Sequence, residues 1–329
     1  MDISYLLWLQ GIREAAAPWV EQLFALISAA VVSPALLLIP CLVYWCVDKA
    51  SGMFALASFT GANLATQTVK GIVCCLRPWV RSPLVHPSAL AVTGATGYSF
   101  PSGHTTAATS VFGSLGWRFR RHRWLFAACV AVVVLVAFSR NFLGVHTPQD
   151  VIGAIVVSVL VMVVVSRMQA WVGAYPVGRR DSIALGIAVA LGIAVLVFAF
   201  VRAFPVAYAA DGTQLVNPVE MRVDMVGGVG YFLGATVGWF CERRWVRFST
   251  DGPTRDRVVR AAVSLALVAV VMLAVLPPLK LALGAASGGT AGFYAYAFLK
   301  AFAPMLCVVW AGPALASSIS HQLAGHRAA

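Results

Sequence analysis

The sequence has little charge. Asp, Glu, Lys and Arg make up only 11% of its 329 residues, whereas hydrophobic residues make up 60%. A soluble domain has roughly 25% charged residues, so the composition excludes a chain of one or two soluble domains. Apolar runs that match the roughly 20 residues of a membrane-spanning helix recur along the chain. The sequence therefore predicts an all-α fold, a polytopic membrane helical bundle.

The sequence also lacks a spacing of cysteines and histidines that would indicate a metal site. None of its seven cysteines belongs to a Cys-x-x-Cys pattern, and most of them lie inside apolar runs. Cysteine in such surroundings behaves as a small hydrophobic residue. We therefore expect packing roles, and we favour packing over a redox pair for the adjacent Cys74 and Cys75.

Acidic residues are scarce. The chain has 12 Asp and Glu against 24 Lys and Arg, which gives a net charge of +12. The basic residues flank apolar runs and form no separate domain, so we expect no nucleic-acid partner. Basic loops between apolar helices are instead typical of the cytoplasmic side of a membrane protein.

The apolar runs divide the chain into elements. An interfacial amphipathic segment is expected at 1–21, because aromatic and aliphatic residues alternate there with charged ones. About nine transmembrane helices should follow, at roughly 22–46, 51–73, 102–118, 124–143, 149–167, 182–203, 223–241, 259–281 and 292–317.

The basic loops predict the orientation. Arginines gather at 118–123, at 167–180 and at 243–260, and a nine-helix count puts these loops on one side, which should be the cytoplasm. The loops at about 74–101 and 143–148 then face outside. No basic n-region starts the sequence, so we expect no cleaved signal peptide. We expect an integral protein of a bacterial plasma membrane.

Three polar clusters should meet on the outer side, and the first is Lys70 with Arg77 and Pro78. Residues seven apart on a helix lie two turns apart on one face, so we expect Lys70 and Arg77 to share a face and Pro78 to end the helix. A lysine within a membrane helix is costly and is a candidate functional residue. The alternative is a pair that extends toward the membrane interface.

The second cluster is the stretch SFPSGH at 99–104. Ser102 is predicted to cap the helix that follows, and Gly103 leaves its backbone N–H unobstructed. The N-terminus of a helix can bind an anion. The alternatives are a capped helix without a ligand and, for His104, a hydrogen-bonded structural histidine.

The third cluster runs from Ser139-Arg140 to His146-Thr147-Pro148-Gln149-Asp150. Thr147, Pro148 and Asp150 fit the first positions of a helix. Asp150 is then either a carboxylate that stabilises the helix dipole or the group that orients the ring of His146 four residues earlier. Arg140 lies near the end of an apolar run and needs an anionic partner, but none lies nearby in the sequence.

The three clusters together contain the groups that a phosphate site needs. Cations and hydrogen-bond donors neutralise phosphoryl oxygens, while one histidine can attack phosphorus and another can protonate the leaving oxygen. No acidic cluster for Mg²⁺ accompanies them, so we expect neither a metal nor another cofactor. The candidate residues are Lys70, Arg77, Ser102, Gly103, His104, Arg140, His146 and Asp150.

The clusters carry a family resemblance. Lys-x6-Arg-Pro, Pro-Ser-Gly-His and Ser-Arg-x5-His-x3-Asp, in this order, resemble the three signature motifs of the type 2 phosphatidic acid phosphatase superfamily. Its members include lipid phosphate phosphatases, undecaprenyl pyrophosphate phosphatases, sphingosine-1-phosphate phosphatases, glucose-6-phosphatase and vanadium haloperoxidases. The haloperoxidases are soluble, and this chain is not expected to be.

The resemblance implies a role for each motif residue. His146 would be the nucleophile that forms a phosphohistidine, Asp150 its partner, and His104 the general acid and then the base for the hydrolysing water. The other motif residues would hold the phosphoryl oxygens: Lys70, Arg77, Ser102, the Gly103 N–H and Arg140.

The resemblance covers about residues 50–170, and it divides the chain. We expect the amphipathic segment 1–21, a phosphatase core of the six-helix type at 22–180 and a C-terminal transmembrane extension at 181–329. The extra helices are similar to those of the sphingosine-1-phosphate phosphatase and glucose-6-phosphatase branches. Glycines recur every fourth residue at 230, 234 and 238, which favours close helix packing within the chain or, alternatively, a homodimer seam.

The expected function is a metal-independent phosphatase of a lipid phosphate or diphosphate, with membrane lipids as its surroundings. Substrate candidates are undecaprenyl pyrophosphate, phosphatidic acid, phosphatidylglycerol phosphate and lysosphingolipid phosphates. A lipid-to-lipid phosphotransferase would use the same motifs. A transporter of an anion or lipid phosphate is a third hypothesis, but it would need polar groups near the membrane midplane.

Overall fold

The computed structural model describes residues 2–92, 95, 97–208, 214, 216–287 and 290–328. The described part is helical between its loops, and its only β contact is an isolated bridge between Tyr208 and Gln214. This confirms the predicted all-α class. The chain forms two compact units: the first comprises Met1–Leu38, Gly61–Val163 and Phe200–Met221, and the second comprises Ile39–Thr60, Val164–Ala199 and Arg222–Ala329.

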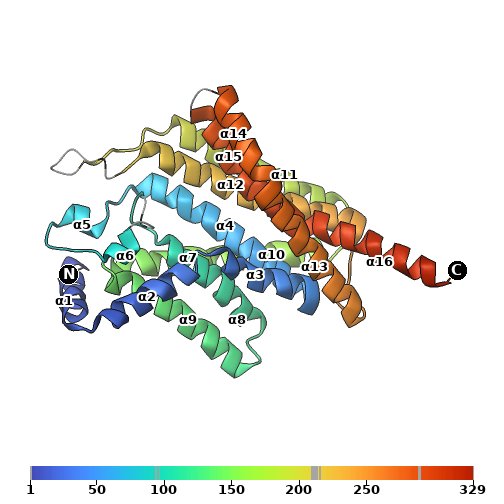
Figure 1. Cartoon of the computed structure of the whole chain (residues 1–329), viewed down its shortest axis with the longest axis horizontal. Helices are drawn as coiled ribbons and strands as arrows, with labels where there is room; N and C mark the ends of the chain where they lie inside the picture. The colour runs from blue at the N-terminus through green and yellow to red at the C-terminus, as the bar shows by residue number, and fades with distance from the viewer. Residues whose placement is uncertain are drawn as a thin grey trace. The chain divides into compact units, whose positions relative to one another are not determined.

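The described part of the chain begins with eleven helical elements, α1 to α9 with two π-helical segments (Figure 1). They are α1 (Asp2–Ala15), α2 (Pro18–Ala30), α3 (Pro34–Leu42), η1 (Val43–Val47), α4 (Lys49–Val73), α5 (Pro78–Arg81), α6 (Ala89–Val92), α7 (Gly103–Ala108), η2 (Thr109–Gly113), α8 (Ser114–Arg118) and α9 (Arg123–Phe142).

The remaining helices are longer on average. They are α10 (Pro148–Gly173), α11 (Arg179–Val201), α12 (Pro218–Cys241), η3 (Glu242–Val246), α13 (Thr254–Val270), η4 (Val271–Val275), α14 (Leu276–Ser287), α15 (Thr290–Leu306), η5 (Cys307–Ala311) and α16 (Gly312–Ala328).

Each of the nine expected spans falls on a helical stretch. Five stretches of the described residues are long and apolar enough to cross a membrane, and a pair bent by 52°, Pro18–Ala30 with Pro34–Val47, would be a sixth. The five are Arg123–Phe142, Pro148–Gly173, Arg179–Val201, Thr254–Gly284 and Thr290–Ser320. The chain is therefore an integral membrane protein, while the count of nine stays a prediction, as do the domain boundaries at 21 and 180.

In the first unit, helix α9 packs against α1, α2 and α7 (Figure 1). Helix α1 also contacts the backbone of two loops. Its Arg13 donates to the carbonyl oxygen of Phe142 at 3.0 Å and to the carbonyl oxygen of His86. The side chain of Asp2 pairs with Arg81 at 2.7 Å. The amphipathic N-terminal segment thus holds the two loops of the first unit that precede and follow the second motif.

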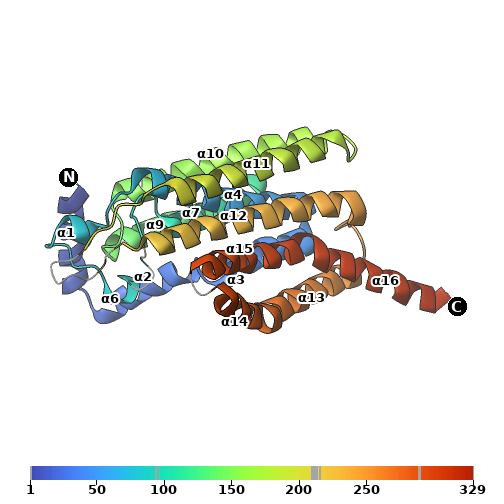
Figure 2. The ribbon, with the colours of Figure 1, turned by 90° about the horizontal axis from the view of Figure 1, so that it is seen from above.

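In the second unit, the glycine stripe of α12 lies against α15, and the two helices run side by side (Figure 2). A Cβ atom on Gly230 would lie 2.5 Å from the carbonyl oxygen of Phe298, and one on Gly234 would lie 2.5 Å from that of Phe302. Such approaches need residues without a side chain. The prediction of packing within the chain is therefore confirmed, and the homodimer stays untested.

Replacing Gly234 by alanine should destabilise the second unit. The new methyl group would have to displace backbone of α15, which costs about 1–3 kcal/mol, and the melting temperature of the purified protein should fall. Gly186→Ala in α11 is the matched control, because nothing lies within 4 Å of its Cβ position. Equal melting temperatures for both variants would contradict this packing.

Candidate functional site

The first motif does not lie on one helix. Helix α4 ends at Val73, because Cys74 adopts a left-handed conformation with φ of 50°. Arg77 follows in extended backbone, and Pro78 is the first residue of α5, a position that suits proline. The expectation that Lys70 and Arg77 share a helix face is therefore wrong, and the chain turns before the position where Pro78 was expected to end the helix.

The turn after α4 brings Arg77 to the third motif. Its Nε donates to the Gly97 carbonyl oxygen at 3.1 Å, and its Nη1 donates to the Val145 carbonyl oxygen at 3.0 Å. The same Nη1 lies 2.9 Å from Nε2 of His146. A guanidinium group can only donate, so Nε2 of His146 accepts, and the proton of the neutral ring is on Nδ1.

Lys70 reaches the segment before the second motif. Its Nζ donates to the Tyr98 carbonyl oxygen at 2.6 Å, and only 6% of the residue is exposed. Together with the Arg77 contact to Gly97, this bond fixes the backbone that leads into SFPSGH. The first motif therefore positions the second through main-chain carbonyl groups.

Ser102 caps helix α7, as predicted. Its Oγ accepts from the Thr105 backbone N–H at 3.4 Å and from the Thr105 hydroxyl at 3.1 Å. Both contacts use Oγ as the acceptor, so the Ser102 hydroxyl hydrogen can be donated to another group. A Cβ atom on Gly103 would meet nothing within 4 Å. Open space therefore lies beside the start of α7, and His104 lies next to it, half-buried.

The turn at 143–147 places His146 beside Asp150. The Thr147 backbone N–H donates to Oδ2 of Asp150 at 2.7 Å, and the Asp150 N–H lies 3.4 Å from Oγ1 of Thr147. This reciprocal capping starts α10. The same Oδ2 lies 3.4 Å from Nδ1 of His146. The carboxylate therefore caps the helix and also faces the protonated nitrogen of the ring, while its role in orienting that ring stays a prediction.

Two residues of this network were not singled out from the sequence. Ser99 is buried, donates to Oδ2 of Asp150 at 2.6 Å, and lies 3.4 Å from Nδ1 of His146. Asn141 donates from Nδ2 to the His146 carbonyl oxygen at 2.9 Å. Ser99 belongs to the quoted SFPSGH stretch, which was the available signal. Nothing in its spacing, however, distinguishes it from a loop serine.

Arg140 is buried without a carboxylate. Only 1% of the residue is exposed, and its Nη1 donates to the hydroxyl of Ser28. Its Nε and Nη2 have no hydrogen-bond partner among the described residues. Buried donors without partners are costly. An anion that approached this side chain would satisfy both donors. It would be the anionic partner that Arg140 is expected to need.

The site has a positive field around His146. Burial lowers the pKa of His146 well below its ordinary value, and the charges of Arg77, Arg140 and Lys70 and the nearby His104 lower it further. The ring is therefore neutral near pH 7 and has an available lone pair on Nε2. No group of three or more His, Cys, Asp or Glu side chains in the described ranges is arranged to hold a metal ion.

Two family models match the chain. The PAP2 superfamily matches residues 51–174, and a second model, described as PAP2 superfamily phosphatase, transmembrane extension, matches residues 226–324. The first match contains all eight candidate residues. This chain belongs to the PAP2 superfamily.

Three relatives show the same similarity over shorter segments. The undecaprenyl-diphosphatase of Sulfolobus acidocaldarius is 32% identical over 101 residues, 31% of this chain and 47% of the relative. Undecaprenyl-diphosphatase BcrC of Bacillus subtilis is 34% identical over 85 residues, 26% of this chain and 40% of the relative. Phosphatidylglycerophosphatase B of the same species is 29% identical over 122 residues, 35% of this chain and 56% of the relative. The chain thus spans about half the length of these relatives. No solved structure matches the chain.

The titration of His146 should follow the charges around it. In the wild type its imidazole should remain neutral until the pH falls well below the ordinary pKa of about 6.5. Arg77→Gln removes a positive charge and should raise this pKa. Nitrogen NMR of the labelled imidazole in detergent-solubilised protein measures both states and also the Nδ1–H tautomer.

Arg81→Gln is the control for this titration, because Arg81 bonds to Asp2 rather than to the ring. It should leave the pKa of His146 unchanged. A wild-type pKa at or above the ordinary value, or a proton on Nε2 at neutral pH, would contradict the arrangement.

Proposed function

We propose that this protein is an integral-membrane phosphatase that hydrolyses a lipid phosphate or lipid diphosphate without a metal ion. One observation carries the proposal: the unprotonated Nε2 of His146 faces Arg77, within a buried set of cations in which two donors of Arg140 have no partner among the described residues. A nucleophilic nitrogen surrounded by cations suits attack on a phosphoryl group. The superfamily and the activities for which the three relatives are named support the same class of reaction.

In the first step, Nε2 of His146 attacks phosphorus. A P–N bond forms while the bond between phosphorus and the leaving oxygen of the lipid breaks, and His104 gives that oxygen a proton. Arg77 leaves Nε2 and donates to a phosphoryl oxygen. The ring of His146 becomes positively charged, and Asp150 stabilises the Nδ1–H that it faces.

In the second step, water hydrolyses the phosphohistidine. His104 has lost its proton and now accepts one from the water, whose oxygen attacks phosphorus as the P–N bond breaks. Inorganic phosphate leaves, and His146 returns to its neutral state. Throughout both steps the phosphoryl oxygens are held by the donors of Lys70, Arg77, Ser102, Gly103 and Arg140.

The substrate is proposed to be a lipid whose phosphate group reaches the open space beside Gly103. The names of the relatives favour undecaprenyl pyrophosphate and phosphatidylglycerol phosphate, and phosphatidic acid and lysosphingolipid phosphates share the same chemistry. The arginine-rich loops favour an orientation in which the site faces outward from a bacterial plasma membrane.

Phosphate release tests the proposal. Detergent-purified protein should release inorganic phosphate from undecaprenyl pyrophosphate, phosphatidic acid, phosphatidylglycerol phosphate or sphingosine-1-phosphate in excess EDTA. His146→Ala should lose about a thousandfold or more of kcat/KM, because it removes the nucleophile. His104→Ala should also lower kcat strongly, because it removes the acid of the first step and the base of the second.

Loss of phosphate release in EDTA would overturn the metal-free mechanism. Transfer of the phosphoryl group to an added lipid alcohol, without inorganic phosphate, would establish a phosphotransferase. Movement of a labelled lipid phosphate across vesicles with no chemical change in wild type or His146→Ala would favour a transporter.

Ser99 should act by positioning rather than by contact with substrate. Ser99→Ala removes the 2.6 Å bond to Asp150 and should lower kcat about tenfold, with a smaller change in KM. Ser99→Thr keeps the hydroxyl and should restore most of the loss. Ser88→Ala is the matched control, because Ser88 is also buried and its Oγ has no partner in the described part of the chain. Equal effects at both serines would rule out this role.

A further inference from the structure

The second unit contains a cavity that the proposed reaction does not use. Its volume is about 400 Å³, and its lining carries three positive charges and no carboxylate. This volume lies in the range of sites for small molecules, roughly 300–1,000 Å³. We call it the cationic pocket, and its lining residues are Lys49, Tyr175, Pro176, Val177, Arg243 and Arg247.

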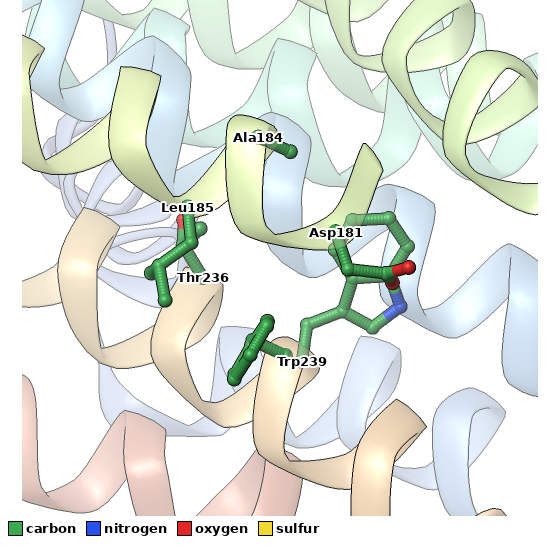
Figure 3. A pocket seen from close by; sticks show the side chains of 6 residues that line it. Asp181, Ala184, Leu185, Thr236 and Trp239 are labelled. Atoms are coloured by element: carbon green, nitrogen blue, oxygen red, sulfur yellow. The ribbon is translucent and has the colours of Figure 1, made fainter. Parts of the chain in front are cut away.

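A buried carboxylate holds Arg243 at the wall of this pocket. Asp181 is 4% exposed, and its Oδ1 accepts from Nε of Arg243 at 2.6 Å, while its Oδ2 accepts from the Gly178 N–H at 2.9 Å. Figure 3 shows Asp181 beside the indole ring of Trp239, and the Arg243 guanidinium lies 5.4 Å from the centre of that ring. The guanidinium is therefore fixed, and its Nη1 has no hydrogen-bond partner among the described residues.

The space around Asp181 is not itself a ligand site. The cavity shown in Figure 3, between α11 and α12, has a volume of about 10 Å³, which is room for about one water molecule. The space beside this carboxylate is therefore too small for a large ligand. Asp181 contributes by holding Arg243, which lines the cationic pocket.

Lys49 is held in the same way by Glu242. The distance from Nζ to Oε1 is 2.5 Å, Glu242 is 0% exposed, and Nζ also donates to the Phe248 carbonyl oxygen at 3.0 Å. Phe248 also presents its ring to Nζ, 4.4 Å from the ring centre. Burial of the acid and partial exposure of the base leave the positive group facing the pocket.

Arg247 is the third cation, and it has no acidic partner in the described ranges. Its φ of 51° is left-handed, a conformation that is strained for a residue other than glycine and that clusters at functional sites. The turn is fixed because its N–H donates to the Glu242 carbonyl oxygen at 2.9 Å and its Nε donates to the Arg243 carbonyl oxygen at 3.0 Å. The exposed remainder of the guanidinium is available to a ligand.

We propose that the cationic pocket binds the phosphate group of an anionic ligand. Three cations face it and two buried acids lie behind them, so one positive charge is left over. Guanidinium groups match phosphate oxygens through paired N–H donors. The phosphate could belong to a membrane phospholipid headgroup or to a water-soluble ester, and the chemistry of recognition is the same.

This site is separate from the proposed phosphatase chemistry, because none of its residues belongs to the three motifs. Under the proposed orientation, Arg243 and Arg247 lie in a basic loop on the cytoplasmic side. Basic segments there attract anionic lipids. Tyr175, Pro176 and Val177 complete the lining of the pocket.

Hydrogen–deuterium exchange tests the site in the full chain. The protein is placed in phosphatidylcholine nanodiscs with increasing phosphatidylglycerol or, separately, with glycerol 3-phosphate in solution. Peptides that cover 174–178 and 242–248 should gain protection, and the probe that acts at lower concentration identifies the source of the phosphate.

Variants at Arg247 and Arg244 decide whether the pocket is responsible. Arg247→Asn removes the charge but tolerates the left-handed backbone, and it should raise the midpoint of protection about tenfold. Arg247→Lys should retain most of the binding. Arg244→Asn is the control, because Arg244 is exposed nearby and does not line the pocket.

Two results would overturn the proposal. One is the absence of protection with either probe in the wild type. The other is an equal loss in the Arg247→Asn and Arg244→Asn variants, which would mean that the loop attracts anions only through its diffuse charge.

Discussion

The carboxylate of Asp150 is the point on which the first unit depends. Its Oδ2 caps helix α10 through the Thr147 N–H, accepts the hydroxyl of Ser99 and faces the ring of His146. Its backbone carbonyl accepts the Ser102 N–H at 3.0 Å. One residue therefore joins the second motif to the third, and the start of α10 is built by the same carboxylate that faces Nδ1 of His146.

Backbone carbonyl groups help to hold the cations of the site in place. Burial lowers the pKa of Arg77 to about 10, and Asp150 only partly offsets this effect. Backbone carbonyl groups supply the remaining compensation, since Arg77 donates to Gly97 and Val145 and Lys70 donates to Tyr98. Carbonyl dipoles hold these side chains without neutralising them. The positive charge is thus preserved for an anionic substrate.

The sequence predicts the helical class and the start of two helices, because these follow from apolar length and from capping residues close together in the chain. Ser102 and the Thr147–Asp150 pair are examples. Lys70 and Arg77 show the limit, because the left-handed turn at Cys74 is set by tertiary contacts that seven-residue spacing does not reveal. Ser99 could not be singled out for a similar reason. Its partner Asp150 lies 51 residues away in the sequence, and nothing near Ser99 in the sequence indicates this contact. The predicted number of membrane-spanning helices is limited in the same way. Helix α4 is long enough to cross a membrane, but it is rich in small and polar residues.

The two units treat buried cations differently, and the difference separates structural charges from functional ones. Arg243 and Lys49 each have a buried carboxylate within 2.6 Å, so their positions are maintained in the absence of a ligand. Arg140 has only the hydroxyl of Ser28, and two of its donors lack partners in the described part of the chain. An unpaired buried charge destabilises a fold by several kcal/mol. Such a charge is retained where a bound ligand offsets the destabilisation. By this argument the anion proposed for the first unit would bind inside the site, at Arg140, whereas the second unit would bind one at the rim, where Arg247 completes a pair of cations that are already stable.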